Sequence, residues 1–211
     1  MITRRNVCSL TIFCTCVYSV AGNLIANEPK DEIRLDVPND WRGERIALPP
    51  QFARDMKVKG VEEIRFAPGM FQPEAKDFFS YVIVFRLEGQ PKLTVGSLNA
   101  ELLTYYRGLA EAVGRGQIKT DGFSIGVVPD NSGKKATLDG YVATLKWVEP
   151  FKTKQAQTLR IEIKSWQSAK NRRTWVFMNV SPNEETDPIW KTMRGVRDRF
   201  LEQNRDEQKK R

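Results

Sequence analysis

The sequence predicts an α+β fold: a single domain with a mainly antiparallel sheet of about seven strands and helices packed on it. Strand-like segments follow one another through mostly short connections, which is typical of antiparallel pairing. Helical periodicity occurs in two places, at 97–114 and near the end of the sequence. The best strand segments are apolar on both faces, so we expect the helices to lie on opposite sides of the sheet.

Three strands are expected before the first helix. Two short ones lie within 43–50 and 60–69, and each ends at a proline, which cannot donate a hydrogen bond to a neighbouring strand. The third, KDFFSYVIVFRLEG at 76–89, has the strongest strand pattern. Aromatic and aliphatic side chains occur on both of its faces, which predicts a central strand covered on both sides.

The first helix is expected at 97–114, where Ser97 suits the N-cap and Gly114 the C-terminal cap. The closing helix should begin with Asp187 as its N-cap and Pro188 at its first helical position. Between the two helices we expect four strands, at 122–128, 138–148, 157–166 and 173–181.

Residues 1–21 have the layout of a secretory signal peptide. Arg4 and Arg5 precede an uncharged run at 7–20, and small residues lead to an expected cleavage after Ala21. The run is shorter than the ~20 residues that a helix needs to cross a bilayer. We therefore expect an exported protein, periplasmic or extracellular, with no transmembrane segment after processing. The paired arginines leave both general secretion and the twin-arginine route open.

The remaining chain is expected to divide into three parts. Residues 22–40 are polar and should form a flexible lead-in. Residues 41–204 contain all the predicted strands and helices and should form the α+β domain. Residues 205–211 form a charged tail, which should be solvated or disordered.

The order of these elements resembles the PsbP/Mog1/DcrB-like superfamily. A strand that contains the DGY segment within 138–148 and a final helix that contains IWKTMRGVRDRF carry the resemblance, which extends over 41–204. The layout also resembles that of uncharacterised exported bacterial proteins. The resemblance implies an accessory or binding protein and supplies no catalytic residues.

Histidine is absent, and the three cysteines, Cys8, Cys14 and Cys16, all lie within the predicted signal peptide. The processed protein could form no disulfide and would have to be stabilised by its core. Zinc sites of Cys or His, haem ligation by these residues and Ser-His-Asp catalysis are excluded. We therefore expect no metal and no cofactor.

The formal net charge is +8, and loss of residues 1–21, with two arginines and no acid, would leave +6. Candidate partners of a basic exported protein are an anionic envelope polymer, a lipid surface or a protein partner. Export disfavours nucleic acid as a partner. The charge could also serve solubility alone, because acids are mixed through the same segments.

Aromatic and basic residues are interleaved through 147–182, which holds three tryptophans and two phenylalanines. Alternation along two neighbouring strands gives a candidate binding face of Arg160, Lys164, Trp166, Arg173 and Trp175. A second interpretation stays open: the closing helix covers Trp175 and Phe177, and the cations only surround it.

These observations support an exported, cofactor-free accessory or binding protein of unknown ligand. One alternative is a hydrolase of acidic envelope or wall polymers that uses carboxylates, which would require two acids facing one cleft. The acidic clusters Glu62-Glu63 and 184–187 are weak candidates, because neighbours on a strand point to opposite faces. A further alternative is a basic adhesion or structural protein of the envelope.

Overall fold

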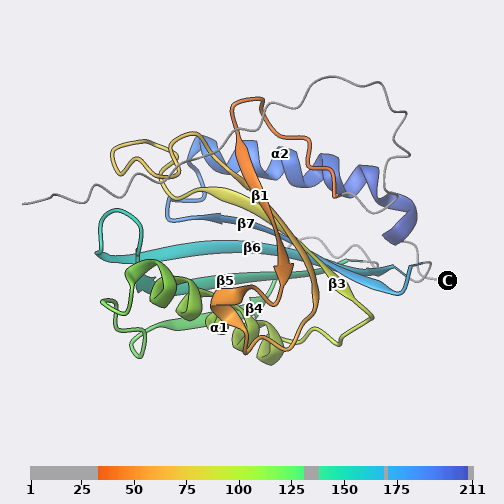
Figure 1. Cartoon of the computed structure of the whole chain (residues 1–211). Coiled ribbons are helices and arrows are strands. Elements are labelled where there is room, and N and C mark those ends of the chain that lie inside the picture. The colour runs from red at the N-terminus through yellow and green to blue at the C-terminus, as the bar shows by residue number, and fades with distance from the viewer. Residues whose placement is uncertain (1–32, 131–137, 169–170, 209–211) are drawn as a thin grey trace, which may run out of the picture. The chain divides into compact units, whose positions relative to one another are not determined.

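Seven strands form one antiparallel sheet in the order β1-β2-β3-β7-β6-β5-β4, and one long helix lies on each face (Figure 1). The computed structural model describes residues 33–130, 138–168 and 171–208. The strands are β1 Arg42–Leu48, β2 Gly60–Phe66, β3 Tyr81–Glu88, β4 Ser124–Pro129, β5 Asp139–Val148, β6 Ala156–Ser168 and β7 Arg173–Ser181. The α+β prediction with a mainly antiparallel sheet is confirmed. The predicted signal peptide lies outside the described residues.

The helices are α1, Val95–Gly114, and α2, Pro188–Gln203. Two short 3-10 helices accompany them: η1, Gln51–Ala53, before β2, and η2, Arg205–Gln208, after α2. Figure 1 shows α1 in green and α2 in blue on opposite sides of the sheet, as the sequence predicted. None of the helices in the described ranges is both long and apolar enough to cross a membrane.

Two separate cores result from this arrangement. The larger one lies between the sheet and α1, with η1 at its margin, and the smaller one lies between the sheet and α2. Successive residues of β3 belong to different cores: Ile83 packs toward α1, whereas Val82 and Val84 pack toward α2. A strand buried on both faces must be apolar at consecutive positions, which explains the pattern of this segment.

The start of α1 differs from the prediction by three residues. Thr94 is the N-cap, and Ser97 is the third residue of a capping box: the Ser97 backbone N–H donates to Thr94 Oγ1, and the Thr94 N–H donates to Ser97 Oγ. The helix ends at Gly114, and Arg115 takes the left-handed conformation (φ 50°) that was expected of a glycine. The start of α2 at Pro188, after the N-cap Asp187, is as predicted.

Three segments differ from their predictions: the start of β3, the described part of the lead-in and the charged tail. β3 begins only at Tyr81, because Phe79 has a φ of 53°, which ends the preceding turn. The described part of the lead-in packs on the domain: Ile33 is 2% exposed and belongs to the α2-side core. The charged tail forms η2 at 205–208, where Glu207 accepts a hydrogen bond from Trp175.

Candidate functional site

Trp166 and Trp175 are direct partners across β6 and β7. Their rings are stacked, with centroids 5.9 Å apart and planes at 14°. They are only 2% and 5% exposed, and Phe200 of α2 contacts both. The prediction that the two indoles lie side by side is confirmed. Their burial agrees with the second interpretation, in which the closing helix covers Trp175, and not with an exposed binding face, because α2 packs on this face of the sheet.

The three cations of the predicted face do not form one cluster. Arg160 lies opposite Ser181, whereas Arg173 lies opposite Ser168. Eight positions along β6 separate these two pairs, which corresponds to roughly 26 Å. Arg160 forms an ion pair with Glu184. The register therefore does not bring these residues together as one binding surface.

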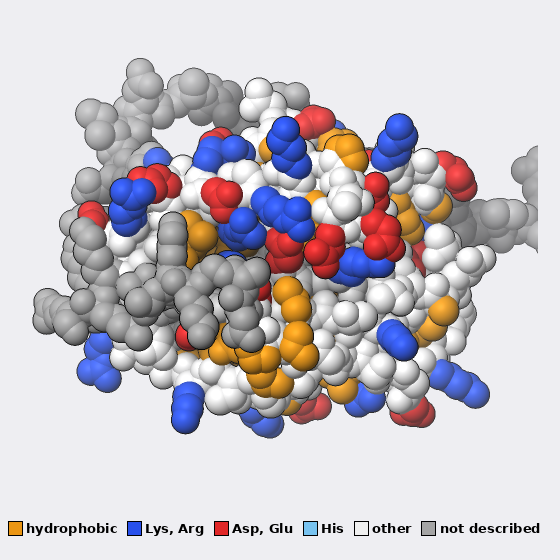
Figure 2. Space-filling view, turned by 180° about the vertical axis from the view of Figure 1, so that it is seen from behind, with side chains coloured by type: hydrophobic (Ala, Val, Ile, Leu, Met, Phe, Trp, Pro, Cys, Tyr) orange, Lys and Arg blue, Asp and Glu red, His pale blue; other side chains and the backbone are white. Residues whose placement is uncertain are grey.

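Lys164, between them on β6, forms an ion pair with Asp130 at 2.8 Å. Figure 2 shows acidic and basic side chains side by side over the face it displays. Charges of mixed sign give weak long-range attraction to a polyanion, because their fields cancel within about a Debye length. The hypothesis that the protein adheres to an anionic polymer is therefore supported only by its positive net charge.

Glu162 lies on β6 between Arg160 and Lys164, and its carboxylate is held by three side chains. Its carboxylate accepts hydrogen bonds from Arg194 at 2.6 and 2.9 Å, from Arg197 at 3.1 Å and from Asn179 at 3.2 Å. Both arginines belong to α2 and the acid to β6. This network joins the helix to the sheet beside the Trp166–Trp175 stack.

The other face of the sheet holds a cavity of about 150 Å³ that we call the aromatic pocket. It is bounded by β1, β2, η1, α1, the start of β3, the β2–β3 connection and the β5–β6 turn. Its lining residues are Glu44, Ile46, Phe52, Glu62, Ile64, Phe66, Met70, Phe71, Phe79, Tyr81, Tyr105, Leu109 and Phe151. Most are apolar, and Phe71 is 41% exposed, so its ring lies where the pocket meets solvent.

The aromatic rings of this pocket contact one another in a chain. Phe71 contacts Phe66 and Phe151 at centroid distances of 5.9 and 5.4 Å, and Phe79 contacts Phe151 at 5.9 Å. At the η1 side, Phe52 meets Tyr105 edge to face at 5.1 Å. Rings in such contact keep fixed orientations, which gives the pocket a defined shape.

Glu62 is the principal polar group of the aromatic pocket. It lies in the middle of β2, and its side chain is fully buried. Tyr105 of α1 donates a hydrogen bond of 2.9 Å to its Oε1. Its Oε2 has no hydrogen-bond partner in the part of the chain that the structure describes. A buried acceptor of this kind is unusual in native proteins and marks a place where a ligand or water could bind.

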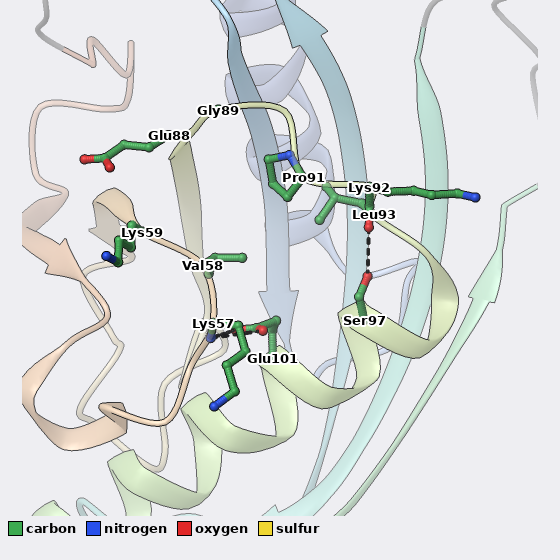
Figure 3. A pocket seen from close by; sticks show the side chains of 10 residues that line it. All are labelled: Lys57, Val58, Lys59, Glu88, Gly89, Pro91, Lys92, Leu93, Ser97 and Glu101. Atoms are coloured by element: carbon green, nitrogen blue, oxygen red, sulfur yellow. Dashed lines mark hydrogen bonds between the residues drawn. The ribbon is translucent and has the colours of Figure 1, made fainter.

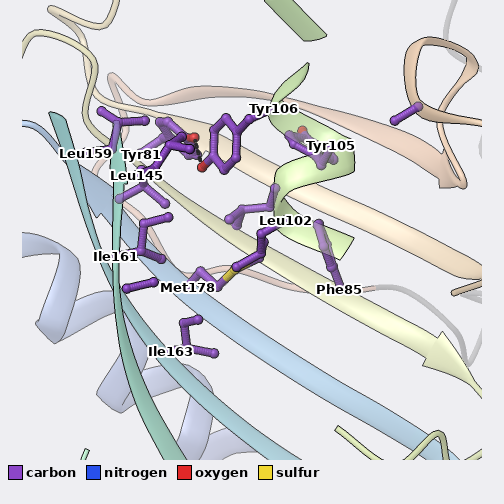
Figure 4. Packing of buried hydrophobic residues seen from close by; sticks show 14 of the residues in the cluster. Tyr81, Phe85, Leu102, Tyr105, Tyr106, Leu145, Leu159, Ile161, Ile163 and Met178 are labelled. Carbon is purple, nitrogen blue, oxygen red and sulfur yellow. Dashed lines mark hydrogen bonds between the residues drawn. The ribbon is translucent and has the colours of Figure 1, made fainter. Parts of the chain in front are cut away.

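Burial raises the pKa of Glu62 to about 7; the hydrogen bond from Tyr105 opposes the rise, and the nearby charge of Glu44 adds to it. Burial also raises the pKa of Tyr105, as well as the pKa of Tyr81 and of Tyr106. Tyr81 and Tyr106 share a hydrogen bond of 2.7 Å in the core (Figure 4). The tyrosines are therefore neutral near pH 7, while Glu62 changes its protonation there.

A second, more open pocket of about 430 Å³ lies beside the start of α1 (Figure 3). Its acid Glu101 accepts hydrogen bonds of 3.0 and 3.1 Å from the backbone N–H of Lys57. Ser97, in the same wall, belongs to the capping box. Both groups are engaged within the protein, and none of the buried side-chain atoms that lack a partner among the described residues belongs to this pocket's wall.

Within the described ranges, no group of three or more Asp, Glu, His or Cys side chains is arranged to hold a metal ion. Glu149 illustrates why an acid can be buried without one. Its carboxylate accepts hydrogen bonds from the backbone N–H of Phe151, Lys152 and Thr153, so it closes the β5–β6 turn. Its role is structural.

Neither a family model nor a curated protein matches this sequence. The likeness to the PsbP/Mog1/DcrB-like superfamily stays a prediction. The candidate site therefore depends on geometry and chemistry alone.

Sequence reasoning named Glu62 only as one of two adjacent acids. Glu62 and Glu63 do point to opposite faces: Glu62 meets Tyr105, whereas Glu63 forms an ion pair with Arg45 at 2.6 Å. The sequence did contain a signal that Glu62 is unusual. In a strand it points to the same face as Ile64 and Phe66, which are both apolar. An acid on the apolar face of a strand is a candidate for a functional group.

Proposed function

We propose that this protein is an exported, cofactor-free binding or accessory protein and that the aromatic pocket takes its ligand. One observation carries the proposal: the fully buried side chain of Glu62, whose Oε2 has no hydrogen-bond partner among the described residues, lines an apolar pocket that reaches solvent beside Phe71. An apolar cavity with a few convergent polar groups is the usual form of a small-molecule site.

The size of the aromatic pocket limits what it can hold. An apolar cavity of about 150 Å³ accepts one benzene molecule. We infer that the pocket takes one ring-sized apolar group with at most a short polar substituent, and that any larger part of the ligand lies outside, near Phe71.

The test is binding of benzyl alcohol to the protein, followed by chemical-shift changes of the pocket side chains. Leu109→Phe should abolish this binding, because the added ring would fill the cavity from α1. Leu103→Phe is the matched control: it is the same substitution on the same helix at a half-buried position outside the pocket. Absence of binding, or equal binding in the Leu109 variant, would refute the proposal.

Export is the second part of the proposal and rests on the layout of residues 1–21. Mass spectrometry of the exported protein should find an N-terminus near Gly22. Recovery of the chain with Met1 intact would contradict export through a cleaved signal.

A carboxylate-dependent hydrolase is the second candidate, because Glu44 and Glu62 line the same pocket. A group with a pKa near 7 suits a general acid. The small apolar pocket favours this function less, since a polymer needs an open cleft. Release of reducing ends from acidic wall polymers, lost in both Glu44→Gln and Glu62→Gln, would support it.

A further inference from the structure

We propose that the ligand of the aromatic pocket is a cationic amine joined to a ring-sized apolar group, with an ammonium N–H donated to Glu62 Oε2. The inference deepens the proposed function and rests on it, because it names the chemical class of ligand for the same pocket. It depends on three features: the charges of the lining, the orphan acceptor and the aromatic rings.

Among the described residues, the lining contains two carboxylates, Glu44 and Glu62, and no lysine or arginine. An anionic ligand would therefore enter a low-dielectric pocket beside like charge and without a counter-ion, which is unfavourable. A cation would compensate the charge of Glu62 where burial has removed water from the carboxylate.

Hydrogen bonding gives the second argument. Tyr105 already satisfies Glu62 Oε1, so the free acceptor is Oε2. A primary or secondary ammonium has an N–H to donate to this oxygen, and a hydrogen bond between two charged groups is stronger than one between neutral groups. A quaternary ammonium has the charge and lacks the N–H, so it should bind more weakly.

The rings of the pocket give the third argument. Phe71 contacts both Phe66 and Phe151, and all three rings line the cavity. The faces of aromatic rings attract cations, and aromatic cages are a recurrent form of ammonium site. The same rings pack against an apolar ligand group, so both parts of an aryl-alkyl amine find complementary surroundings.

The more open pocket of Figure 3 does not offer this combination. It is lined by three lysines, Lys57, Lys59 and Lys92, with Glu88 and Glu101. The carboxylate of Glu101 already accepts hydrogen bonds from the backbone N–H of Lys57. The three lysines outnumber the two acids, so the charge of this lining is unfavourable for a cation.

The proposed contact predicts a pH dependence of binding. The described groups that face Glu62 are Glu44 from β1, Tyr105 and Tyr106 from α1 and Tyr81 from β3, and the tyrosines remain neutral in this range. The ammonium needs the ionised form of Glu62, whose pKa is about 7 in the free protein. The apparent affinity should therefore rise about tenfold from pH 6 to pH 8, because the competent fraction rises by that factor.

The experiment uses four ligands that share one phenyl group: 2-phenylethylamine, its trimethylammonium analogue, 2-phenylethanol and 3-phenylpropionate. Their affinities for the protein are measured by calorimetry at pH 6, 7 and 8. We expect 2-phenylethylamine to bind most tightly at pH 8 and the carboxylate to bind least. Affinity for the neutral alcohol should change little with pH.

Glu62→Gln should remove the preference for the amine and its pH dependence while leaving 2-phenylethanol binding in place. Glu101→Gln is the control, because this acid belongs to the other pocket. The pH profile of the unsubstituted protein tests the proposal even if Glu62→Gln does not fold. An alcohol or carboxylate that binds as tightly as the amine at pH 8 would overturn the inference and leave the pocket's binding function intact. Binding of none of the four would overturn both.

Discussion

Trp175 donates its indole N–H to the carboxylate of Glu207 at 2.9 Å. The donor lies on β7 in the α2-side core, and the acceptor lies in η2, beyond the end of α2. Glu207 also accepts a hydrogen bond of 2.9 Å from Asn171 in the β6–β7 turn. A segment that is charged in sequence is thus held against the sheet by one acid.

Glu207→Ala should lower the free energy of unfolding by about 1–2 kcal/mol, because the nearly buried indole N–H would lose a charged acceptor. Glu207→Gln, which keeps an acceptor oxygen, should lose less. Glu202→Ala is the control, since its ion pair with Arg205 is exposed and should contribute under about 0.5 kcal/mol. Urea unfolding followed by tryptophan fluorescence measures all three. Equal losses for Glu207→Ala and Glu202→Ala would show that η2 is not held by this contact.

Trp175→Ala should lower the free energy of unfolding by roughly 3–5 kcal/mol, the usual cost of emptying a buried aromatic site. Trp175 is packed against both Trp166 and Phe200, so the cavity would open in the middle of the α2-side core. Val128→Ala, at a side chain 54% exposed on β4, should change stability by under about 0.5 kcal/mol. A Trp175 loss as small as the Val128 loss would contradict the packing described for α2.

Glu62 should make stability depend on pH in a direction opposite to that of most carboxylates. Its pKa rises from 4.5 to about 7 on folding, so the folded state holds the proton more tightly than the unfolded state. Its favourable contribution is complete below pH 4.5 and is lost as the pH rises through about 7. Relative to Glu62→Gln, the unsubstituted protein should lose about 2–3 kcal/mol of stability between pH 5 and pH 8.

Paired denaturant curves of the two proteins at pH 5, 6, 7 and 8 measure this difference directly. The comparison cancels the other titrating groups, because both proteins contain them. A difference that stays constant across the series would mean that Glu62 is not desolvated in the folded protein.

The two arginines that hold Glu162 should act as a coupled unit. Arg194→Ala and Arg197→Ala each leave the carboxylate one of these arginines, whereas the double variant leaves it Asn179 as its one partner among the described residues. We expect the double variant to lose more stability than the two single losses together, with a coupling of about 0.5–3 kcal/mol. Adding Glu162→Gln to the double variant should restore part of the loss, because no uncompensated charge then remains. Strict additivity would show that solvent, rather than the arginines, stabilises this acid.

The local elements were largely predictable from sequence. β7 occupies 173–181 as predicted, and α2 begins at Pro188, because the alternation of apolar residues and the Asp-Pro start are local signals. Apolar residues on both faces of β3 also predicted helices on opposite sides of the sheet. The start of α1 was misplaced because Thr94 and Ser97 can both cap a helix, and the choice depends on hydrogen bonds between them.

What the sequence by itself determined was therefore which residues share a face; what covers each face was decided by tertiary structure. Alternation placed Trp166 and Trp175 together, but their burial depends on α2, which is distant in the chain from Trp166. The same holds for Glu62, whose hydrogen bond to Tyr105 and whose aromatic surroundings come from segments far from β2 in sequence. Periodicity reports the geometry of one strand or helix, whereas burial, a raised pKa and a pocket arise only when separate elements pack together.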